Sequence, residues 1–331
     1  MKPFARVAAV AASALMLSAG VALADPAIVY DSGGKFDKSF NEAAYNGIDK
    51  FKKDTGTNYA EFEVQTDAQR EQAFTRFAEK GADPIIGVGF SQETAISKVA
   101  PKFPKTHFVI IDDVVDLPNV QSIVFKENEG SFLVGVLAAM ASKSGKVGFV
   151  GGMDIPLIRK FECGYAQGVK YINNGATVFQ NMTGTTGAAW NDPTKGGELA
   201  KGQFDQGADV VFAAAGGTGI GVYQAAQDNG KLAIGVDSNQ NYLHPGTMLT
   251  SMMKRVDVAV YNTLKSAKDG TWKPGLSVFG LKENGVDWAY DDNNKSLITD
   301  AMKAKVEEAK SDIISGKIQV HDYMADNACP N

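Results

Sequence analysis

The chain has 331 residues, and its 33 basic and 38 acidic side chains give it a formal charge of −5 at neutral pH. This acidic balance disfavours nucleic acid or another polyanion as the partner. A hydrophobic content of 44% is ordinary for a globular protein, and a chain of this length usually folds into two domains rather than one.

The first 24 residues are typical of a secretory signal peptide. Basic Lys2 and Arg6 precede an apolar run from Val7 to Leu17, and residues 22–24 form an Ala-Leu-Ala cleavage site. The run is shorter than the roughly 20 residues that a helix needs to span a bilayer. We therefore expect cleavage before Asp25, which would leave 31 basic and 38 acidic residues and a formal charge of −7.

The rest of the sequence predicts a soluble exported protein. No cysteine follows the apolar run of the leader, so the residue that would carry a lipid anchor is missing. No later apolar run is long enough to cross a membrane. We expect a monomer in an exported compartment, most simply a bacterial periplasm, without a membrane anchor.

Cys163 and Cys329 are the only cysteines, and they lie far apart in the sequence. In an oxidising compartment, a disulfide between them would hold the C-terminal tail against the body of the protein. Two buried free thiols are the alternative, and the spacing does not decide between the two. The expected export favours the disulfide.

From Asp25 onward, short β-branched runs alternate with stretches whose apolar residues recur at helical spacing. The first half predicts strands at residues 26–31, 59–65, 84–90, 106–112 and 120–125, with helices at 41–56, 68–81 and 91–103. The second half predicts helices at 130–143, 158–173, 192–207 and 218–230, with strands at 146–152, 175–184, 208–217 and 231–237. Such alternation forms parallel βαβ units. The fold class is therefore α/β, with two doubly wound lobes joined by short crossovers.

Polar, aromatic or glycine residues follow several of the predicted strands. They are Asp31, Phe90, Asp112, the pair Gly216 and Gly217, and Asp237. Doubly wound sheets bind ligands at the carboxyl ends of their strands. Two lobes whose strand ends face each other would form a cleft lined from both sides, as in binding proteins and many enzymes.

The stretch VYDSGGKFDKSFNEAAYNG, residues 29–47, joins a strand to a helix through a Gly-Gly turn. It lacks the Lys-Ser or Lys-Thr pair of a phosphate loop, and its glycines have the wrong spacing for a dinucleotide site. It places Phe40 at the start of a helix, and Trp190 lies in a loop of the other half. Aromatic side chains on opposite lobes favour a planar ligand stacked between them.

Two charged residues suit a sugar on such a ligand. A carboxylate such as Asp237 can accept hydrogen bonds from two vicinal hydroxyls, and an ammonium group such as Lys254 can donate one. The pattern favours a polar ring ligand that bears a sugar.

The sequence offers no set of catalytic or metal-binding residues. The three histidines, His107, His244 and His321, do not lie near one another. No cluster has zinc-site spacing, and no G-x-S-x-G nucleophile motif is present. We therefore expect a binding protein without a cofactor, not an enzyme. A periplasmic nucleoside hydrolase is the enzyme alternative, and it would need a denser aspartate cluster than DSGGKFDKS provides.

The stretch at residues 31–47 resembles the start of the basic membrane protein and purine nucleoside receptor family, the substrate-binding components of ABC importers. Further segments are similar in the same order: VGFVGGMDIPLIRKFECGY, WNDPTKG, ADVVFAAAGGTGIGV, IGVDSNQ and TSMMKRVDVAVY. The resemblance covers nearly the whole chain after the leader. It implies a type I periplasmic binding fold, in which two Rossmann-like lobes joined by three crossovers close over a ligand.

The resemblance also implies how the chain divides and what it works with. The first lobe would comprise residues 25–125 and 254–275, and the second lobe residues 126–253 and 276–331. The partners would be a small solute and a separate permease and ATPase of the inner membrane.

The resemblance implies a base-recognition site formed by both lobes. Asp31 and Ser32 match its polar turn, and Phe40, with Asn41 beside it, matches a base-stacking position. Trp190 matches the second stacking aromatic. This chain departs from the family at two of these positions, because relatives often have asparagine at the position of Ser32 and phenylalanine at that of Trp190.

The resemblance implies a ribose site beside it. Asp237 matches a carboxylate that binds the ribose diol, and Lys254 matches a nearby donor. Asp112 matches a second polar contact, while Gly216 and Gly217 would let the backbone approach the ligand.

The leading hypothesis is a receptor for purine nucleosides such as adenosine, guanosine or inosine. A receptor for a sugar, a free nucleobase or a flavin is the alternative of the same class. A repressor-type transcription factor would share the binding fold, but the signal peptide and the lack of a basic N-terminal helix-turn-helix argue against it.

Overall fold

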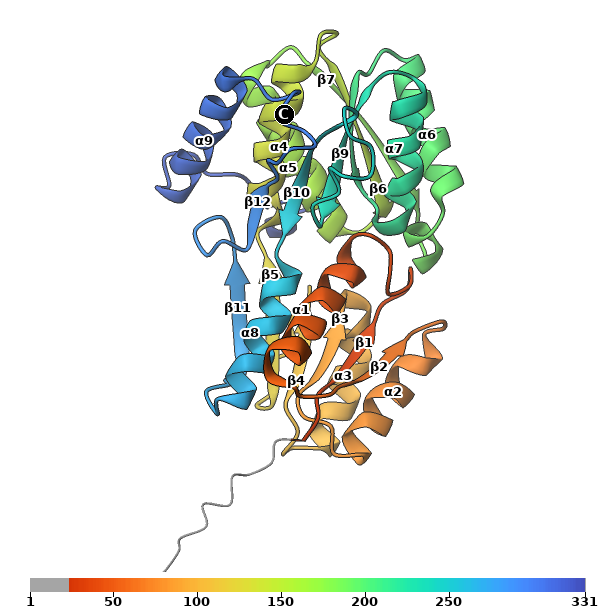
Figure 1. Ribbon diagram of the computed structural model, residues 1–331, viewed down its shortest axis with the longest axis vertical. Helices are drawn as coiled ribbons and strands as arrows, with labels where there is room; N and C mark the ends of the chain where they lie inside the picture. Colours follow the sequence, from red (N-terminus) through yellow and green to blue (C-terminus); the bar gives the residue numbers. More distant parts are fainter. Residues whose placement is uncertain (1–23, 331) are drawn as a thin grey trace, which may run out of the picture.

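The computed structural model describes residues 24–330, which form two α/β lobes at opposite ends of an elongated molecule (Figure 1). Each lobe is built on a six-stranded sheet. The predicted fold class is confirmed. The signal peptide expected at residues 1–24 lies outside the described residues, apart from Ala24.

The first sheet has the strand order β11-β5-β4-β3-β1-β2, and its strands are parallel. The strands are β1 (Ala27–Tyr30), β2 (Ala60–Glu63), β3 (Ile85–Val88), β4 (Phe108–Ile111), β5 (Val120–Phe125) and β11 (Gly275–Phe279). The helices of this lobe are α1 (Phe40–Thr55), α2 (Ala68–Glu79), α3 (Glu93–Val99) and α8 (Val256–Lys268). All residues of β1, β3 and β4 are buried, as expected for parallel strands covered on both faces.

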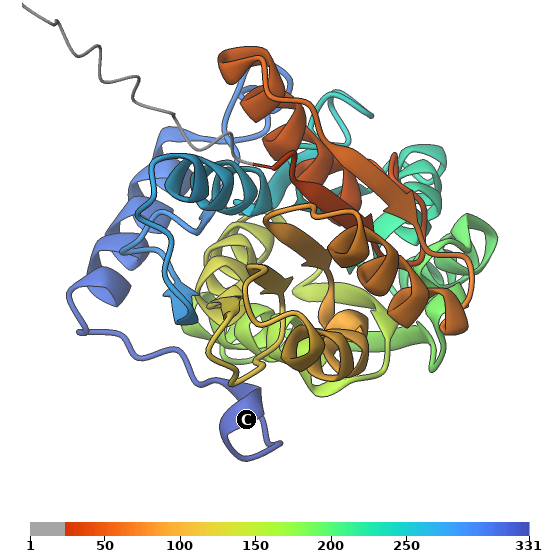
Figure 2. The same ribbon diagram turned by 90° about the horizontal axis from the view of Figure 1, so that it is seen from below.

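Successive residues of β1 pack on opposite faces of the first sheet. Ile28 and Tyr30 belong to the cluster that contains Ile48 of α1, whereas Val29 belongs to the cluster that contains Phe74 of α2. Figure 2 shows the same arrangement from below, with α1 and α8 on one side of the sheet and α2 and α3 on the other. The strand ends are thereby left free at the junction of the lobes.

The second sheet has the strand order β12-β10-β9-β8-β6-β7, with β12 antiparallel to β10 and the other pairs parallel. The strands are β6 (Lys146–Met153), β7 (Thr177–Gly184), β8 (Val210–Ala214), β9 (Leu232–Asp237), β10 (Met248–Lys254) and β12 (Val286–Trp288). The helices are α4 (Glu127–Ala141), α5 (Pro156–Ile172), α6 (Pro193–Asp205), α7 (Gly219–Asp228) and α9 (Asp300–Ile314).

Helices α4 and α5 of the second lobe pack with their backbones in close contact. A Cβ atom at Gly135 of α4 would clash with the carbonyl oxygen of Tyr165, and one at Gly168 of α5 would clash with that of Phe132. Glycine permits this approach because it has no side chain. Polar groups at the start of α4 can therefore reach side chains of α5 directly.

Over the described residues, the chain crosses between the lobes three times, between β5 and α4, between β10 and α8, and between β11 and β12. The domain boundary expected at residue 275 is wrong, because β11 pairs with β5 in the first sheet. The return to the second lobe lies between Phe279 and Val286. β11 is a largely exposed edge strand, so its sequence carries little of the apolar pattern that predicts a strand.

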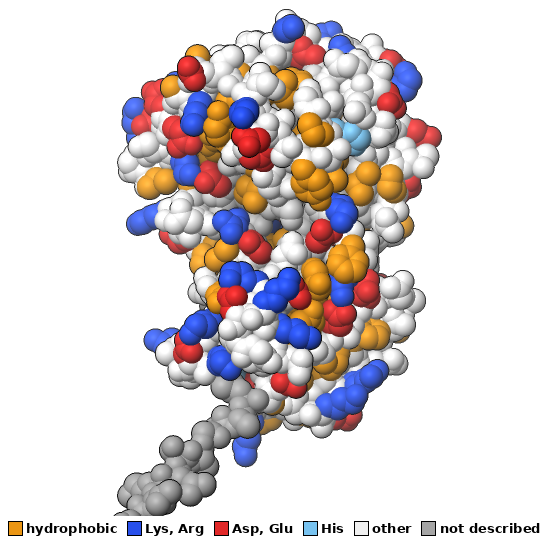
Figure 3. All heavy atoms as spheres, in the orientation of Figure 1, with side chains coloured by type: hydrophobic (Ala, Val, Ile, Leu, Met, Phe, Trp, Pro, Cys, Tyr) orange, Lys and Arg blue, Asp and Glu red, His pale blue; other side chains and the backbone are white. Residues whose placement is uncertain are grey.

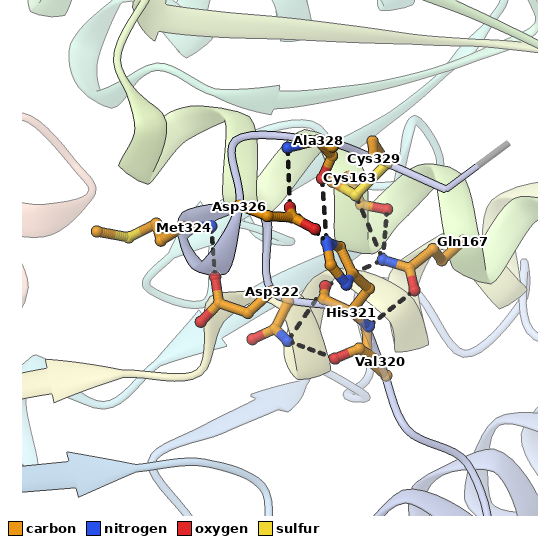
Figure 4. Close-up of polar contacts among 10 residues, drawn as sticks. Cys163, Gln167, Val320, His321, Asp322, Met324, Asp326, Ala328 and Cys329 are labelled. Atoms are coloured by element: carbon orange, nitrogen blue, oxygen red, sulfur yellow. Dashed lines mark hydrogen bonds and ion pairs between the residues drawn. A yellow bond between two sulfur atoms is a disulfide. The ribbon is translucent and has the colours of Figure 1, made fainter.

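After α9, the chain returns to α5, where Cys163 and Cys329 form a disulfide (Figure 4). Of the two states that the sequence left open, the structure has the bridge. On the face drawn in Figure 3, acidic and basic side chains are interspersed over both lobes, and the molecule narrows where the lobes meet.

Candidate functional site

A cavity lies between the lobes, where strand ends of both sheets meet. The space between its walls is about 580 Å³, open solvent at its mouth included. Ten of the eleven residues expected at a binding site line it: Asp31, Ser32, Phe40, Asn41, Phe90, Asp112, Trp190, Gly216, Asp237 and Lys254. A side chain at the eleventh, Gly217, would meet the backbone of Trp190 and the side chain of Asn191.

Eight further residues line the cavity and were not expected: Asp37, Gly89, Leu157, Ile158, Phe161, Ala214, Ala215 and Val236. The apolar ones lie in strands, in a turn or in the first part of α5, where a sequence pattern indicates a buried core and no more. Of these residues, Asp37 could have been predicted from the sequence. An aspartate just before a helix commonly binds the free N–H groups of the first turn.

The apolar walls of the cavity come from both lobes. Phe40 begins α1, and Phe90 begins a short 3₁₀-helix after β3. Across the cavity, Trp190 ends a short 3₁₀-helix, and Phe161 belongs to α5. The indole ring lies against the backbone of Gly152, where any Cβ atom would clash with it.

Asp31 is held in place by partners of its own lobe. Its backbone N–H donates to Asn41 Oδ1 (3.0 Å), and the N–H of Ser32 donates to Asp31 Oδ1 (2.7 Å). Nη1 of Arg70 lies 2.9 Å from Asp31 Oδ1, and both side chains are buried. Gly89 leaves room for the carboxylate, because a Cβ atom there would clash with Asp31 Oδ2. No sequence signal pointed to Arg70, which occupies an ordinary position on an amphipathic helix.

Asp37 caps α1 from inside the cavity. Its carboxylate accepts hydrogen bonds from the backbone N–H groups of Ser39 (2.8 Å), Asn41 (3.0 Å) and Glu42 (3.1 Å). Burial raises its pKa to about 6, although these three donors act to lower it.

Lys254 enters the cavity from the end of β10 and is almost fully buried. Its Nζ lies 2.6 Å from Asp112 Oδ2 and 2.9 Å from Glu127 Oε1. It also lies 5.1 Å from the ring centre of Phe40 and 5.5 Å from that of Phe161. Burial acts to lower the pKa of Lys254, but the charges of Asp112 and Glu127 outweigh it and raise the pKa. The lysine is therefore a fixed positive charge.

The two carboxyl groups beside Lys254 have pKa values shifted in opposite directions. Burial raises the pKa of Asp112 to about 7, although Lys254 acts to lower it. Burial also acts on Glu127, but Lys254 and Lys160 together lower its pKa. Glu127 is thus the ionised partner of Lys254. Of the two, Asp112 is the one whose pKa is raised toward neutral pH, and its buried Oδ1 has no hydrogen-bond partner among residues 24–330.

Asp237 ends β9 and is bonded across the cleft. Ser39 Oγ of the first lobe donates to Asp237 Oδ2 (2.5 Å), and burial raises the pKa of Asp237 to about 6. Two more hydrogen bonds join the same segments, from Ser238 Oγ to the carbonyl of Ser39 (3.0 Å) and from Gln240 Nε2 to that of Lys38 (2.9 Å). We call these three hydrogen bonds the latch.

Three non-glycine residues at the cleft have left-handed backbones: Lys38 (φ 61°), Asp112 (φ 73°) and Asp237 (φ 63°). This conformation is uncommon outside glycine and clusters at functional sites. It turns both carboxylates at the strand ends into the cavity.

Within residues 24–330, no group of three or more histidine, cysteine, aspartate or glutamate side chains is placed to hold a metal ion. The three histidines lie elsewhere, with His107 beside Asp83, His244 beside Gln227 and His321 in the C-terminal tail. Over the same part of the chain, no helix is both long enough and apolar enough to cross a membrane.

The family described as "ABC transporter substrate-binding protein PnrA-like" matches residues 25–323. The chain belongs to this family. The resemblance found in the sequence is thus confirmed, and the protein is an ABC transporter substrate-binding protein.

Named relatives cover most of the chain. It is 36% identical over 317 residues to the "ABC transporter nucleoside-binding protein BmpA" of Lactococcus lactis, covering 89% of this chain and 88% of the relative. It is 34% identical to "Basic membrane protein D" of Borreliella burgdorferi, covering 86% and 84% of the two chains. An "Uncharacterized lipoprotein" of Pyrococcus horikoshii is 36% identical, with coverage of 84% and 72%.

A solved structure shares the fold. The solute-binding protein of an ABC transporter system from Aeropyrum pernix has a TM-score of 0.83 and 29% identity, and the match covers 90% of this chain and 93% of that one. The Lactococcus lactis relative and the Aeropyrum pernix structure are both named as binding proteins of ABC transporters.

Proposed function

We propose that the protein binds a purine nucleoside between its lobes and delivers it to the permease and ATPase of an ABC importer. One observation carries the proposal: the cavity combines aromatic rings from both lobes with a charged group at the end of each of four strands, β1, β4, β9 and β10. The nucleoside-binding name of the Lactococcus lactis relative supports the same ligand class.

The base would lie between Phe40 and Trp190, which belong to opposite lobes. Base–aromatic stacking contributes about 1–3 kcal/mol per base. Asp31 would accept hydrogen bonds from N–H groups on the edge of the base. Its carboxylate is suited to this role because Arg70 and the N–H of Ser32 already fix its position, so little ordering is required on binding.

The ribose would lie toward Asp237 and Lys254. Asp237 has its Oδ2 bonded to Ser39, and a carboxylate has about four acceptor sites, so it can still accept from a diol. The unpartnered Oδ1 of Asp112 is a further acceptor for a hydroxyl group. An unpartnered buried acceptor is costly, and a ligand hydroxyl would remove that cost.

Closure of the lobes would depend on the ligand. A nucleoside that contacts both lobes binds the closed arrangement more tightly than the open one and shifts the population toward it. The latch adds three hydrogen bonds that exist only when residues 38–39 meet residues 236–240. The ligand and the latch would therefore favour the same state.

The location would be an exported compartment, with the bacterial periplasm the simplest case. The leader-like N-terminus supports export, and cleavage after Ala24 would release the chain. The lipoprotein names of several relatives make anchoring the alternative. Extraction of the native protein from intact cells by osmotic shock, without detergent, would distinguish a free receptor from an anchored one.

Isothermal titration of protein refolded to remove bound ligand tests the proposal. We expect tight binding of adenosine, guanosine or inosine, weaker binding of uridine and no heat with ribose. The absence of binding heat with every nucleoside would contradict the proposed function. Sugars, free nucleobases and flavins would then be the ligands to test. Prolonged incubation with inosine provides the enzyme control, because release of hypoxanthine would show a nucleoside hydrolase.

A further inference from the structure

A buried series of alternating charges runs from the cavity to the C-terminal tail. Asp112 Oδ2 lies 2.6 Å from Lys254 Nζ, which lies 2.9 Å from Glu127 Oε1. Glu127 Oε2 lies 3.0 Å from Lys160 Nζ, which lies 3.3 Å from Asp322 Oδ2. We call these five residues the ion chain. Its first two members line the cavity, and its last belongs to the tail.

The inner members of the ion chain depend on one another. The side chains of Lys254 and Glu127 are 2% and 1% exposed, and that of Lys160 is 7% exposed. A buried charge that loses its partner is strongly destabilising. Glu127 uses a different oxygen for each lysine, so its position is set from both sides.

Lys160 connects this buried centre to the tail. Its Nζ also donates to the carbonyl of Phe125 (2.8 Å), directly before the first crossover. Burial acts to lower the pKa of Lys160, but the charges of Glu127 and Asp322 raise it. Asp322 is therefore the second acid that compensates this lysine.

The tail is fastened to the same two helices that carry Glu127 and Lys160 (Figure 4). Cys163 of α5 is bonded to Cys329. Gln167, one turn further along α5, accepts from the N–H of His321 (2.9 Å) and donates to its carbonyl (3.1 Å). Asn128 of α4 donates to the carbonyl of Val320 (2.9 Å). These contacts place Asp322 within reach of Lys160.

We infer that the disulfide-held tail belongs to the ligand-binding machinery, with Asp322 as a positioning residue that acts on Lys254 through Lys160 and Glu127. The inference rests on the proposed function, because Lys254 is the group that would meet the ligand. Asp322 itself does not line the cavity. Its loss changes how firmly Glu127 is held, and hence where the ammonium group of Lys254 lies.

The first test compares two isosteric variants of the tail. Asp322→Asn keeps an oxygen for the N–H of Met324, which Asp322 bonds in the structure, but removes the charge next to Lys160. We expect nucleoside affinity to fall about two- to fivefold, the scale of a partly exposed ion pair. Asp326→Asn is the matched control, because Asp326 bonds within the tail to His321 and Ala328. Asp322→Glu should restore the affinity.

Equal losses in the Asp322→Asn and Asp326→Asn proteins would overturn the inference, because they would show that the tail matters only as a packed segment. Unchanged affinity in Asp322→Asn would overturn it as well. If the wild-type protein binds no nucleoside, the proposed function fails, and the ion chain is then tested without ligand.

The ligand-free test uses NMR spectra of protein with isotopically labelled lysine side chains. We expect Asp322→Asn to shift the side-chain signals of Lys160 and Lys254, and Asp326→Asn to leave both in place. A Lys254 signal that is identical in the wild-type and Asp322→Asn proteins would overturn the inference, whatever the ligand.

The disulfide is tested with Cys329→Ser. Release of the tail should weaken nucleoside binding at least as much as Asp322→Asn does. Since both changes act on the same series of charges, the double variant should bind no more weakly than Cys329→Ser alone. Additive losses would show that the tail and Asp322 act independently and would overturn the role assigned to the disulfide.

Discussion

The two lobes supply polar groups to the cavity in different ways. In the first lobe, Asp31 and Asp37 are held by partners of the same lobe, namely Arg70, Asn41 and the backbone N–H groups at the start of α1. In the second lobe, Asp237 takes its hydrogen bond from Ser39 across the cleft. The carboxylates on the base side of the proposed site are thus positioned within one lobe, whereas the carboxylate on the sugar side is completed by closure.

Lys254 is held both from within its own lobe and from across the cleft. Glu127 holds it from within the second lobe, and Asp112 holds it from the first. Because the charges of Asp112 and Glu127 raise its pKa, Lys254 is protonated in this arrangement of the lobes. An open cleft would leave Lys254 with one carboxylate and Asp112 with none. Asp112 would then take up a proton or bind water. The ion pair between Lys254 and Asp112 is therefore a second contact, besides the latch, that favours closure.

Lys254→Met should have the largest effect, because it leaves two buried carboxylates without their shared cation. We expect the free energy of unfolding to fall by about 3–5 kcal/mol, measured by urea denaturation at neutral pH. The double variant Lys254→Met/Asp112→Asn should recover part of this loss. A loss below about 1 kcal/mol, the range of surface pairs, would contradict a cation shared by both lobes.

Phe40→Ala should weaken ligand binding by about 1–3 kcal/mol through the loss of base stacking. Since Phe40 would contact the base and not the sugar, nucleosides and free nucleobases should lose affinity equally in isothermal titration. Phe36→Ala is the matched control, because Phe36 is 59% exposed and lies outside the cavity, in the loop just before Phe40. Unchanged affinity in the Phe40 variant would contradict the stacking role.

Much of this site can be predicted from sequence because strand ends are predictable. Asp31, Asp112 and Asp237 each follow a short apolar run, and parallel strands bring their carboxyl ends to one edge. Residues that reach the cavity from a helix, such as Phe161 and Ile158, have no such signal, since their spacing is that of any buried helical face. In the turn after β8, the lining of the cavity ends one residue before Gly217, a difference too fine for a sequence pattern to predict.

The charge partners could not be predicted for a different reason. Arg70 meets Asp31, and Glu127 meets Lys254, across 39 and 127 residues of sequence. Nothing in local spacing relates such pairs, because a fold and not a periodicity brings them together. The β11 boundary failed for a related reason, since an exposed edge strand lacks the apolar alternation that marks strands elsewhere in the chain.

The affinity for ribosides should rise with pH between about 5 and 7. Burial raises the pKa of Asp237 from 3.8 to about 6, and its ionised form is the stronger acceptor for the two hydroxyls of a diol. The change should approach about tenfold per pH unit below that pKa, measured by titration calorimetry with inosine. Asp237→Asn should remove this part of the pH dependence, and a slope that persists in this variant would assign it to Asp37 or Asp112.

The stability of the ligand-free protein should change with pH in the opposite direction. A carboxyl group with a raised pKa holds its proton in the folded state after the unfolded chain has lost it. Its contribution is fully present below about pH 4 and is lost as pH rises through about 6 for Asp237 and about 7 for Asp112. A thermal midpoint that rises steadily from pH 5 to 7.5 would contradict the raised pKa values.

The smallest expected effect is a difference between two serine variants of the latch, one of which changes both ligand recognition and closure and the other closure alone. Ser39 Oγ donates to the carboxylate of Asp237, whereas Ser238 Oγ donates to the backbone carbonyl of Ser39. Both bonds cross the cleft, so Ser39→Ala and Ser238→Ala should each weaken closure by about 1 kcal/mol, the scale of one hydrogen bond. Ser39→Ala alone should also shift the preference between a riboside and its 2′-deoxy analogue, because it changes how Asp237 is held. Equal preferences in the two variants would mean that the second lobe presents Asp237 without help from the first. The contrast between base-side carboxylates held within one lobe and a sugar-side carboxylate completed by closure would then no longer hold.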